Sequence, residues 1–190
     1  MVAHLELCVA AHAKVGPSQP LVVLRFEAVG ERRYWLLIEA KADAKLRQID
    51  ALLRQLWLEC CGHMSAFHVG RRELAMTSAA AIAFSIGAKL EYEYDFGSTT
   101  ALTGERVGTR QGSIGRGSVR LLARNQPIAW PCGECAAPAT VVCPYCIDDG
   151  AGLFCDTHAG VHEHADEEVY LPVVNSPRMG VCGYTGASDA

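Results

Sequence analysis

The sequence predicts an α+β protein in which a mixed or antiparallel sheet packs on one main helix, with a small zinc-stabilised module at the C-terminal end. Three observations predict this class: short strand-like segments dominate the first two thirds, one amphipathic helix interrupts them, and paired cysteines and histidines fill residues 132–164. The proline-bounded stretch 127–131 marks the boundary. We expect an α+β domain over residues 1–127 and the zinc module with its tail over residues 128–190.

The first predicted elements are a strand pair and a helix. Residues 21–27 and 34–38 are short apolar runs joined by turn-forming residues 30–32, which is typical of neighbouring strands. Asp43 is expected to cap the following helix. Apolar residues recur there at helical spacing, which predicts a core-facing stripe made of Leu46, Ile49, Leu52, Leu53, Leu56 and Trp57.

The remaining segments of the first domain also resemble strands. Residues 65–69 predict one strand, whereas the alanine-rich residues 78–86 do not distinguish helix from strand. Residues 89–96 alternate strictly, so one face of that strand should carry Leu90, Tyr92, Tyr94 and Phe96. A turn at residues 97–98 leads to a partner strand over residues 99–107, a loop over 108–117 and a last strand over 119–123.

Composition and charge narrow the class of protein. Half of the 190 residues are hydrophobic and a fifth are charged, as in ordinary globular proteins. No apolar run reaches the roughly 18 residues that span a bilayer, and the first residues lack the pattern of a signal peptide. We therefore expect a cytoplasmic protein with no membrane partner. In that compartment its nine cysteines indicate metal thiolates rather than disulfides.

Eight residues have the paired spacing of zinc ligands: Cys132, Cys135, Cys143, Cys146, Cys155, His158, His162 and His164. Structural zinc takes four such ligands, so eight predict two Zn²⁺ ions. The segment is too short to bury a sufficient apolar core, so metal binding would supply its folding free energy. Four ligands per ion leave no open position, which favours a structural role for both metals.

The ligands can be paired in two ways. Sequential pairing gives the first four residues to one ion and the last four to the other. Interleaved pairing gives one ion the first and third pairs, and it is the order we favour because it resembles B-box and related cross-brace modules. If His162 or His164 is not a ligand, Cys182 is the candidate substitute.

The charge of the chain is distributed unevenly around a formal net charge of -4. Residues 132–170 contain eight acids and no lysine or arginine, which argues against phosphate binding by the module and favours a protein partner. A nucleic-acid partner would have to use the one basic segment, whose arginines are Arg106, Arg110, Arg116, Arg120 and Arg124. The simpler interpretation of that segment is a solvated strand face and loop.

Cys60, Cys61 and His63 form a separate cluster after the expected helix. Packing of small buried cysteines is the simpler interpretation. A third metal site would require a further ligand from elsewhere, such as Cys8 or His68.

Two segments resemble the plasmid pRiA4b ORF-3-like family: residues 57–67 (WLECCGHMSAF) and residues 89–100 (KLEYEYDFGSTT). The likeness covers most of residues 1–125, and the tail at residues 171–186 resembles an extension found in some members. The resemblance implies the α+β fold and supports His158 and His164 as ligands. It also implies a context in plasmid or mobile-element biology.

The sequence favours a non-enzymatic interaction or regulatory protein. Asp95, Phe96 and Gly97 match a kinase tripeptide, but no glycine-rich ATP loop or catalytic-loop motif accompanies them. Asp95 is expected to accept hydrogen bonds from the turn at residues 97–99. The alternative is an enzyme with a pocket around Tyr92, Tyr94 and Asp95.

Overall fold

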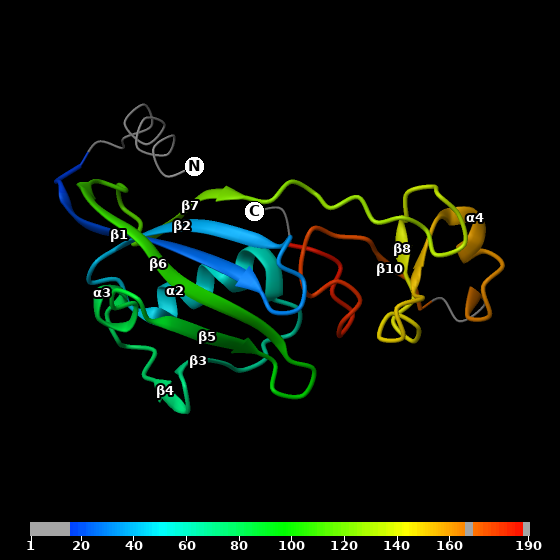
Figure 1. Cartoon of the computed structure of the whole chain (residues 1–190), viewed down its shortest axis with the longest axis horizontal. Helices are drawn as coiled ribbons and strands as arrows, with labels where there is room; N and C mark the ends of the chain where they lie inside the picture. Colours follow the sequence, from blue (N-terminus) through cyan, green and yellow to red (C-terminus); the bar gives the residue numbers. More distant parts are fainter. Residues whose placement is uncertain (1–15, 166–168, 188–190) are drawn as a thin grey trace.

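The computed structural model describes residues 16–165 and 169–187, and its main feature is a seven-stranded sheet (Figure 1). The strand order is β4-β3-β5-β6-β1-β2-β7, and every neighbouring pair is antiparallel. The predicted α+β class is confirmed. The strands are β1 (Gln19–Ala28), β2 (Trp35–Lys41), β3 (Ser65–Val69), β4 (Arg72–Leu74), β5 (Lys89–Tyr94), β6 (Thr100–Gly112) and β7 (Val119–Arg124).

One helical segment covers a face of this sheet (Figure 1). Helix α2 (Leu46–Leu53) continues into a π-helical turn, η1 (Arg54–Leu58). Four residues of the predicted apolar stripe are buried (Leu46, Ile49, Leu53 and Trp57), and the other two, Leu52 and Leu56, are half-buried. The predicted cap at Asp43 is wrong. Lys45 is the N-cap, and its backbone N–H donates to Gln48 Oε1 at 2.8 Å, because a glutamine three residues into a helix can satisfy that donor. The ambiguous alanine-rich stretch forms the short helix α3 (Ala80–Ala83).

Alternation along strand β5 places one set of its side chains in the core. Leu90, Tyr92 and Tyr94 are buried, as their alternation predicts. Phe96 departs from the prediction with 51% of its surface exposed. Asp95 adopts a φ of 65°, which turns the chain and ends the alternation before Phe96.

Strand β6 is longer than the sequence predicts. The expected loop at residues 108–117 begins as strand, because β1 provides hydrogen-bonding partners as far as the Gln19–Gly112 pair. The glycines and polar residues of this stretch have weak strand propensity, so pairing with β1 decides its structure. A β-bulge between Val23 and Leu24 accommodates the long strand.

Gly104 in β6 is a test of how tightly this core packs. A Cβ atom there would lie 2.7 Å from Phe26 Cε1 and 3.0 Å from Phe84 Cε1. We expect Gly104→Ala to lower the free energy of unfolding by about 1–3 kcal/mol, since the rings must move. Gly108→Ala is the matched control in the same strand, because its nearest neighbour would be Val23 Cβ at 3.9 Å. Equal denaturation midpoints for the two variants would contradict this packing.

The module (residues 128–172) contains a second, smaller sheet. Its strand order is β10-β8-β9, from β8 (Val141–Val142), β9 (Leu153–Phe154) and β10 (Leu171–Pro172), and one helical turn, α4 (Asp156–Ala159), follows β9. The main buried cluster consists of Cys132, Cys143, Phe154 and Ala159. Half of this cluster is cysteine, so apolar burial alone is too small to stabilise the module.

The tail (residues 173–187) returns from the module to the larger sheet, as its orange and red trace shows (Figure 1). Ser176 Oγ donates to the carbonyl oxygen of Trp57 at 2.6 Å, and the side chains of Arg178 and Tyr184 are buried. Asn125 Nδ2 donates to Asn175 Oδ1 at 2.7 Å beside the end of β7. The tail therefore follows the module in sequence but packs against the α+β domain.

Across the two described ranges, no helix combines the length and the apolar character needed to cross a membrane.

Candidate metal centres

The first candidate metal centre of the module consists of Cys132, Cys135, Cys155 and His158. His158 Nδ1 lies 3.5 Å from Cys132 Sγ and 3.3 Å from Cys155 Sγ, and the Sγ atoms of Cys135 and Cys155 are 4.0 Å apart. Tetrahedral zinc places its sulfur ligands about 3.8 Å apart and a sulfur and a nitrogen about 3.5 Å apart. The distances in this group match a tetrahedral site for one ion.

The second centre consists of Cys143, Cys146, His162 and His164. His164 Nδ1 lies 3.4 Å from Cys143 Sγ and 3.5 Å from Cys146 Sγ, and His162 Nε2 lies 3.4 Å from Cys146 Sγ. The two imidazole nitrogens are 3.2 Å apart. These spacings also suit four ligands of one zinc ion.

Short backbone elements aim the ligands at each centre. Cys155 is the N-cap of α4, so the single helical turn brings His158 back beside it. Gly152 allows the close approach of the second cysteine pair, because a Cβ there would lie 2.8 Å from the carbonyl oxygen of Cys143. The local chain therefore folds around the metal positions themselves.

The environment of Cys132 favours a thiolate. Burial would raise the pKa of this thiol, but hydrogen bonds from the backbone N–H groups of Cys155, Glu134 and Cys135 outweigh burial and lower the pKa to about 6. Zinc binds the deprotonated form of cysteine. The backbone thus prepares the first centre for a metal ion.

The two groups contain the residues that interleaved pairing assigns to each ion. Each group combines one early Cys-x-x-Cys pair with one later pair, and all four ligand atoms of a group lie within 4.8 Å of one another. Cys182 does not substitute for His162 or His164 in this arrangement. It lies beside Cys61 instead, with their Sγ atoms 3.6 Å apart.

A third group brings together Cys60, Cys61, His63 and Cys182. The sequence cluster at residues 60–63 thus gains a fourth member from the tail, and the expected packing of all its cysteines is wrong because Cys61 is exposed. His68 is not that member, since its Nε2 lies 3.7 Å from Glu93 Oε2. Cys8, the other suggested ligand, lies outside the described residues.

The residues of the suggested enzyme pocket are engaged in internal contacts. The hydroxyl groups of the buried Tyr92 and Tyr94 donate to Asp50 Oδ1 at 2.7 Å and to Glu59 Oε1 at 3.2 Å. Asp95 accepts hydrogen bonds from the backbone N–H groups of Gly97 and Ser98, as predicted for the turn.

The tail supplies a further partner for Asp95. Arg178 Nη2 donates to its Oδ2 at 2.6 Å. That hydrogen bond holds the pKa of Asp95 at about 2, with burial opposing and the backbone N–H groups of the turn adding to the effect. These residues are organised to hold the structure together.

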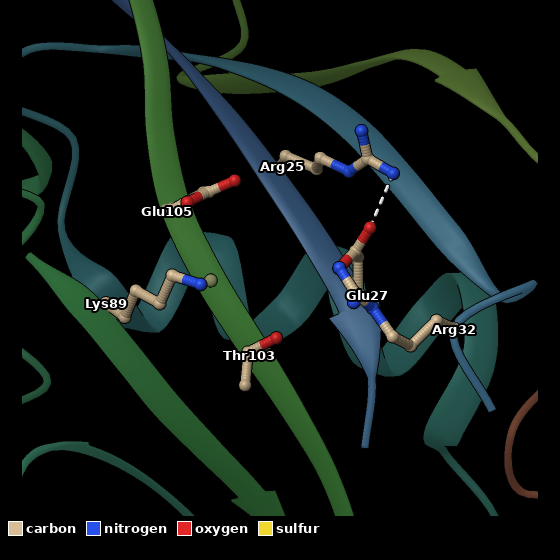
Figure 2. A pocket seen from close by; sticks show the side chains of 7 residues that line it. Arg25, Glu27, Arg32, Lys89, Thr103 and Glu105 are labelled. Atoms are coloured by element: carbon tan, nitrogen blue, oxygen red, sulfur yellow. Dashed lines mark hydrogen bonds and ion pairs between the residues drawn. The ribbon is translucent and has the colours of Figure 1, made fainter. Parts of the chain in front are cut away.

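A small polar pocket of about 130 Å³ lies on the face of the sheet that is turned away from α2 (Figure 2). Strand alternation explains its composition, since the residues next to buried Leu90 and Phe26 must face solvent. Glu27 forms ion pairs with both Arg25 and Arg32, and these pairs neutralise part of the positive charge of the pocket. The pocket is lined by Arg25, Glu27, Arg32, Lys89, Thr103, Gly104 and Glu105.

Three of the five arginines of the basic segment have internal partners. Arg110 and Arg120 both bind the fully buried Glu39, at 2.6 Å and 2.8 Å. Arg124 Nη2 donates to the carbonyl oxygen of Asn175 at 2.6 Å. Arg116 is exposed and Arg106 is half-buried. The sequence did not indicate that Glu39 would be buried, because it stands in an ordinary strand.

The fold and the Cys/His groups define an α+β protein with candidate metal centres. No family model and no curated protein matches the chain. Among solved structures, it is similar to the protein of unknown function MM3350 from Methanosarcina mazei Go1 at 12% identity, with a TM-score of 0.48, over 56% of this chain and 69% of that chain. This likeness assigns no function. Membership of the pRiA4b ORF-3-like family stays a prediction.

Proposed function

We propose that the protein is a non-enzymatic interaction protein whose module, held by two Zn²⁺ ions, binds a basic segment of a partner protein. The cytoplasm is the location that suits this proposal, since zinc thiolates persist where thiols stay reduced. A plasmid or mobile-element context is part of the proposal only through the family resemblance.

The charge of the module is the observation that carries this proposal. Residues 132–170 contain no lysine or arginine. Opposite charge on a partner would speed its association and select it over acidic competitors. Within the described part of the module, the exposed acids are Glu134, Asp148, Asp149, Asp156 and Glu163.

Exposed apolar side chains support a protein partner. Tyr145 and Val161 expose 59% and 78% of their surfaces. Tyrosine is enriched at protein interfaces, where its ring supplies contact area and its hydroxyl stays hydrated. We therefore expect the bound segment to combine lysines or arginines with an apolar anchor.

The ligand sets support a structural role for the metals. Each module group offers four protein ligands, so a bound zinc ion would have no position for water or substrate. The engagement of Arg110 and Arg120 by Glu39 also makes phosphate binding less favourable, because their charge is already compensated.

A charge-matched binding experiment tests the proposal. Arginine- and lysine-rich peptides with one aromatic anchor would be titrated against the zinc-loaded full chain by fluorescence anisotropy. We expect the triple variant Asp148→Asn, Asp149→Asn, Glu163→Gln to weaken binding about tenfold or more through the loss of charge complementarity. The control removes three exposed acids outside the module: Asp43→Asn, Glu73→Gln and Glu91→Gln.

Equal weakening by both triples would mean non-specific attraction and would contradict a site on the module. Binding of duplex DNA instead, lost in Arg106→Ala with Arg116→Ala, would favour the nucleic-acid alternative.

A further inference from the structure

The cluster that joins the tail to the α+β domain has the composition of a metal site. We infer that Cys60, Cys61, His63 and Cys182 bind a third zinc-class cation, which fastens the tail to the larger sheet. Three thiolates and one imidazole are a recurrent ligand set of structural zinc.

The distances within the cluster converge on one point. Cys61 Sγ lies 3.7 Å from Cys60 Sγ and 3.6 Å from Cys182 Sγ, close to the separation of about 3.8 Å between sulfur ligands of tetrahedral zinc. His63 Nε2 lies 2.9 Å from Cys61 Sγ and 3.2 Å from Cys182 Sγ, less than the roughly 3.5 Å of a tetrahedral site, so the imidazole would move outward slightly around an ion. Four ligand atoms from two distant segments therefore surround one position.

Backbone turns in both segments bring the four side chains together. Gly62 has a φ of 82°, which turns the chain between two members of the cluster. Cys182 has a φ of 52° between Gly180 and Gly183, although a non-glycine residue in this region is uncommon and strained. The strained conformation directs the Cys182 thiol at the cluster, which gives the strain a physical reason.

Neighbouring side chains complete the arrangement expected around a bound metal. His63 faces the cluster with Nε2, and its other ring nitrogen lies 3.5 Å from Asp95 Oδ1, which resembles the carboxylate that orients a zinc-bound histidine. Arg178 Nε donates to Cys60 Sγ at 3.4 Å. Three thiolates with a divalent cation carry one net negative charge, and the buried Arg178 guanidinium, which is shared with Asp95, lies beside that charge.

Core packing and a disulfide explain this cluster less well. Cys61 and Cys182 are exposed, so they do not serve as small core residues. A disulfide would join two sulfurs at about 2.05 Å and would leave the histidine and the third thiol without a role. A metal ion uses all four groups.

Metal counting on the intact, zinc-loaded chain tests the inference. Native mass spectrometry and elemental analysis should find three zinc ions in the wild-type chain and two in Cys182→Ser. Thr185→Ala, an exposed change in the same tail, should keep three. Hydrogen exchange should rise across residues 174–187 in Cys182→Ser, because the fastening is lost.

Two results would overturn the inference. Two ions in the wild-type chain, with or without a disulfide in the tail peptide, would leave no third ion for the cluster. Three ions retained by both Cys182→Ser and His63→Ala would place the third ion elsewhere.

Discussion

Replacing Cys143 by serine is expected to remove the ion of the second centre and to loosen the small sheet of the module, while the seven-stranded sheet stays folded. Cys143 is fully buried and belongs to the second centre. Structural zinc in isolated finger peptides contributes about 10–16 kcal/mol to folding, far more than the apolar cluster of this module can replace. The variant should bind one ion fewer, and hydrogen exchange should become fast across β8 and β9 but stay slow in β1 and β6.

Ala151→Ser is the matched control for this variant, since it introduces the same side chain at an exposed position between the ligand pairs. This control should keep all its metal ions, and hydrogen exchange in β8 and β9 should stay slow. If β8 and β9 stay protected in Cys143→Ser, the module does not depend on its metals for folding.

The same measurement separates the two ligand pairings. Interleaved pairing puts Cys132 and Cys155 on one ion, so the double serine variant should lose no more metal directly than either single variant. Sequential pairing would put them on different ions, and the double variant would lose both. Replacing zinc by cadmium or cobalt would show how many thiolates bind the ion at each centre.

Arg178→Ala is expected to release the tail and to lower the free energy of unfolding by about 3 kcal/mol or more, since removal of one partner leaves a buried ion pair uncompensated. Arg178 has no exposed surface. Besides its ion pair, its guanidinium donates to the carbonyl oxygen of Ser98 at 3.0 Å and to Thr100 Oγ1 at 3.1 Å. It also lies 4.8 Å from the ring centroid of Tyr94.

Chemical denaturation and hydrogen exchange across residues 174–187 would check this prediction. Arg178→Lys should be intermediate, because lysine keeps the charge but loses the planar fork. Arg116→Ala removes an exposed arginine and should leave stability within about 0.5 kcal/mol of the wild-type chain. A stable Arg178→Ala with unchanged exchange in the tail would show that the guanidinium does not hold it.

Local patterns made much of this structure predictable. The apolar stripe that ends at Trp57 and the alternation of β5 identified core residues, since periodicity in the chain reports directly which side chains share a face. Both module centres also use residues chosen from spacing alone, because paired ligands lie within one turn of each other. The cap at Lys45 and the end of β6 were missed, since small differences in hydrogen bonding set element boundaries.

Long-range contacts were the part that the sequence did not predict. His63 and Cys182 are 119 positions apart, so no local spacing links them. The glycines around Cys182 were the available signal, but turns with glycine occur in many loops. Burial of Glu39 in β2 beneath two arginines likewise depends on β6 and β7, which lie on either side of the β1–β2 pair only in the folded sheet.

The sequence by itself determined the α+β class, the core stripe and the eight module residues with metal-ligand spacing, because each depends on chemistry repeated over a few neighbouring positions. Tertiary structure alone decided which ligand pairs share a centre, that Arg178 is buried against Asp95, and that Cys182 completes the cluster at residues 60–63. The first outcome depends on how the turns of the module meet. The other two depend on where the tail docks, and docking is set by the shape and charge of a surface that forms only after the sheet has folded.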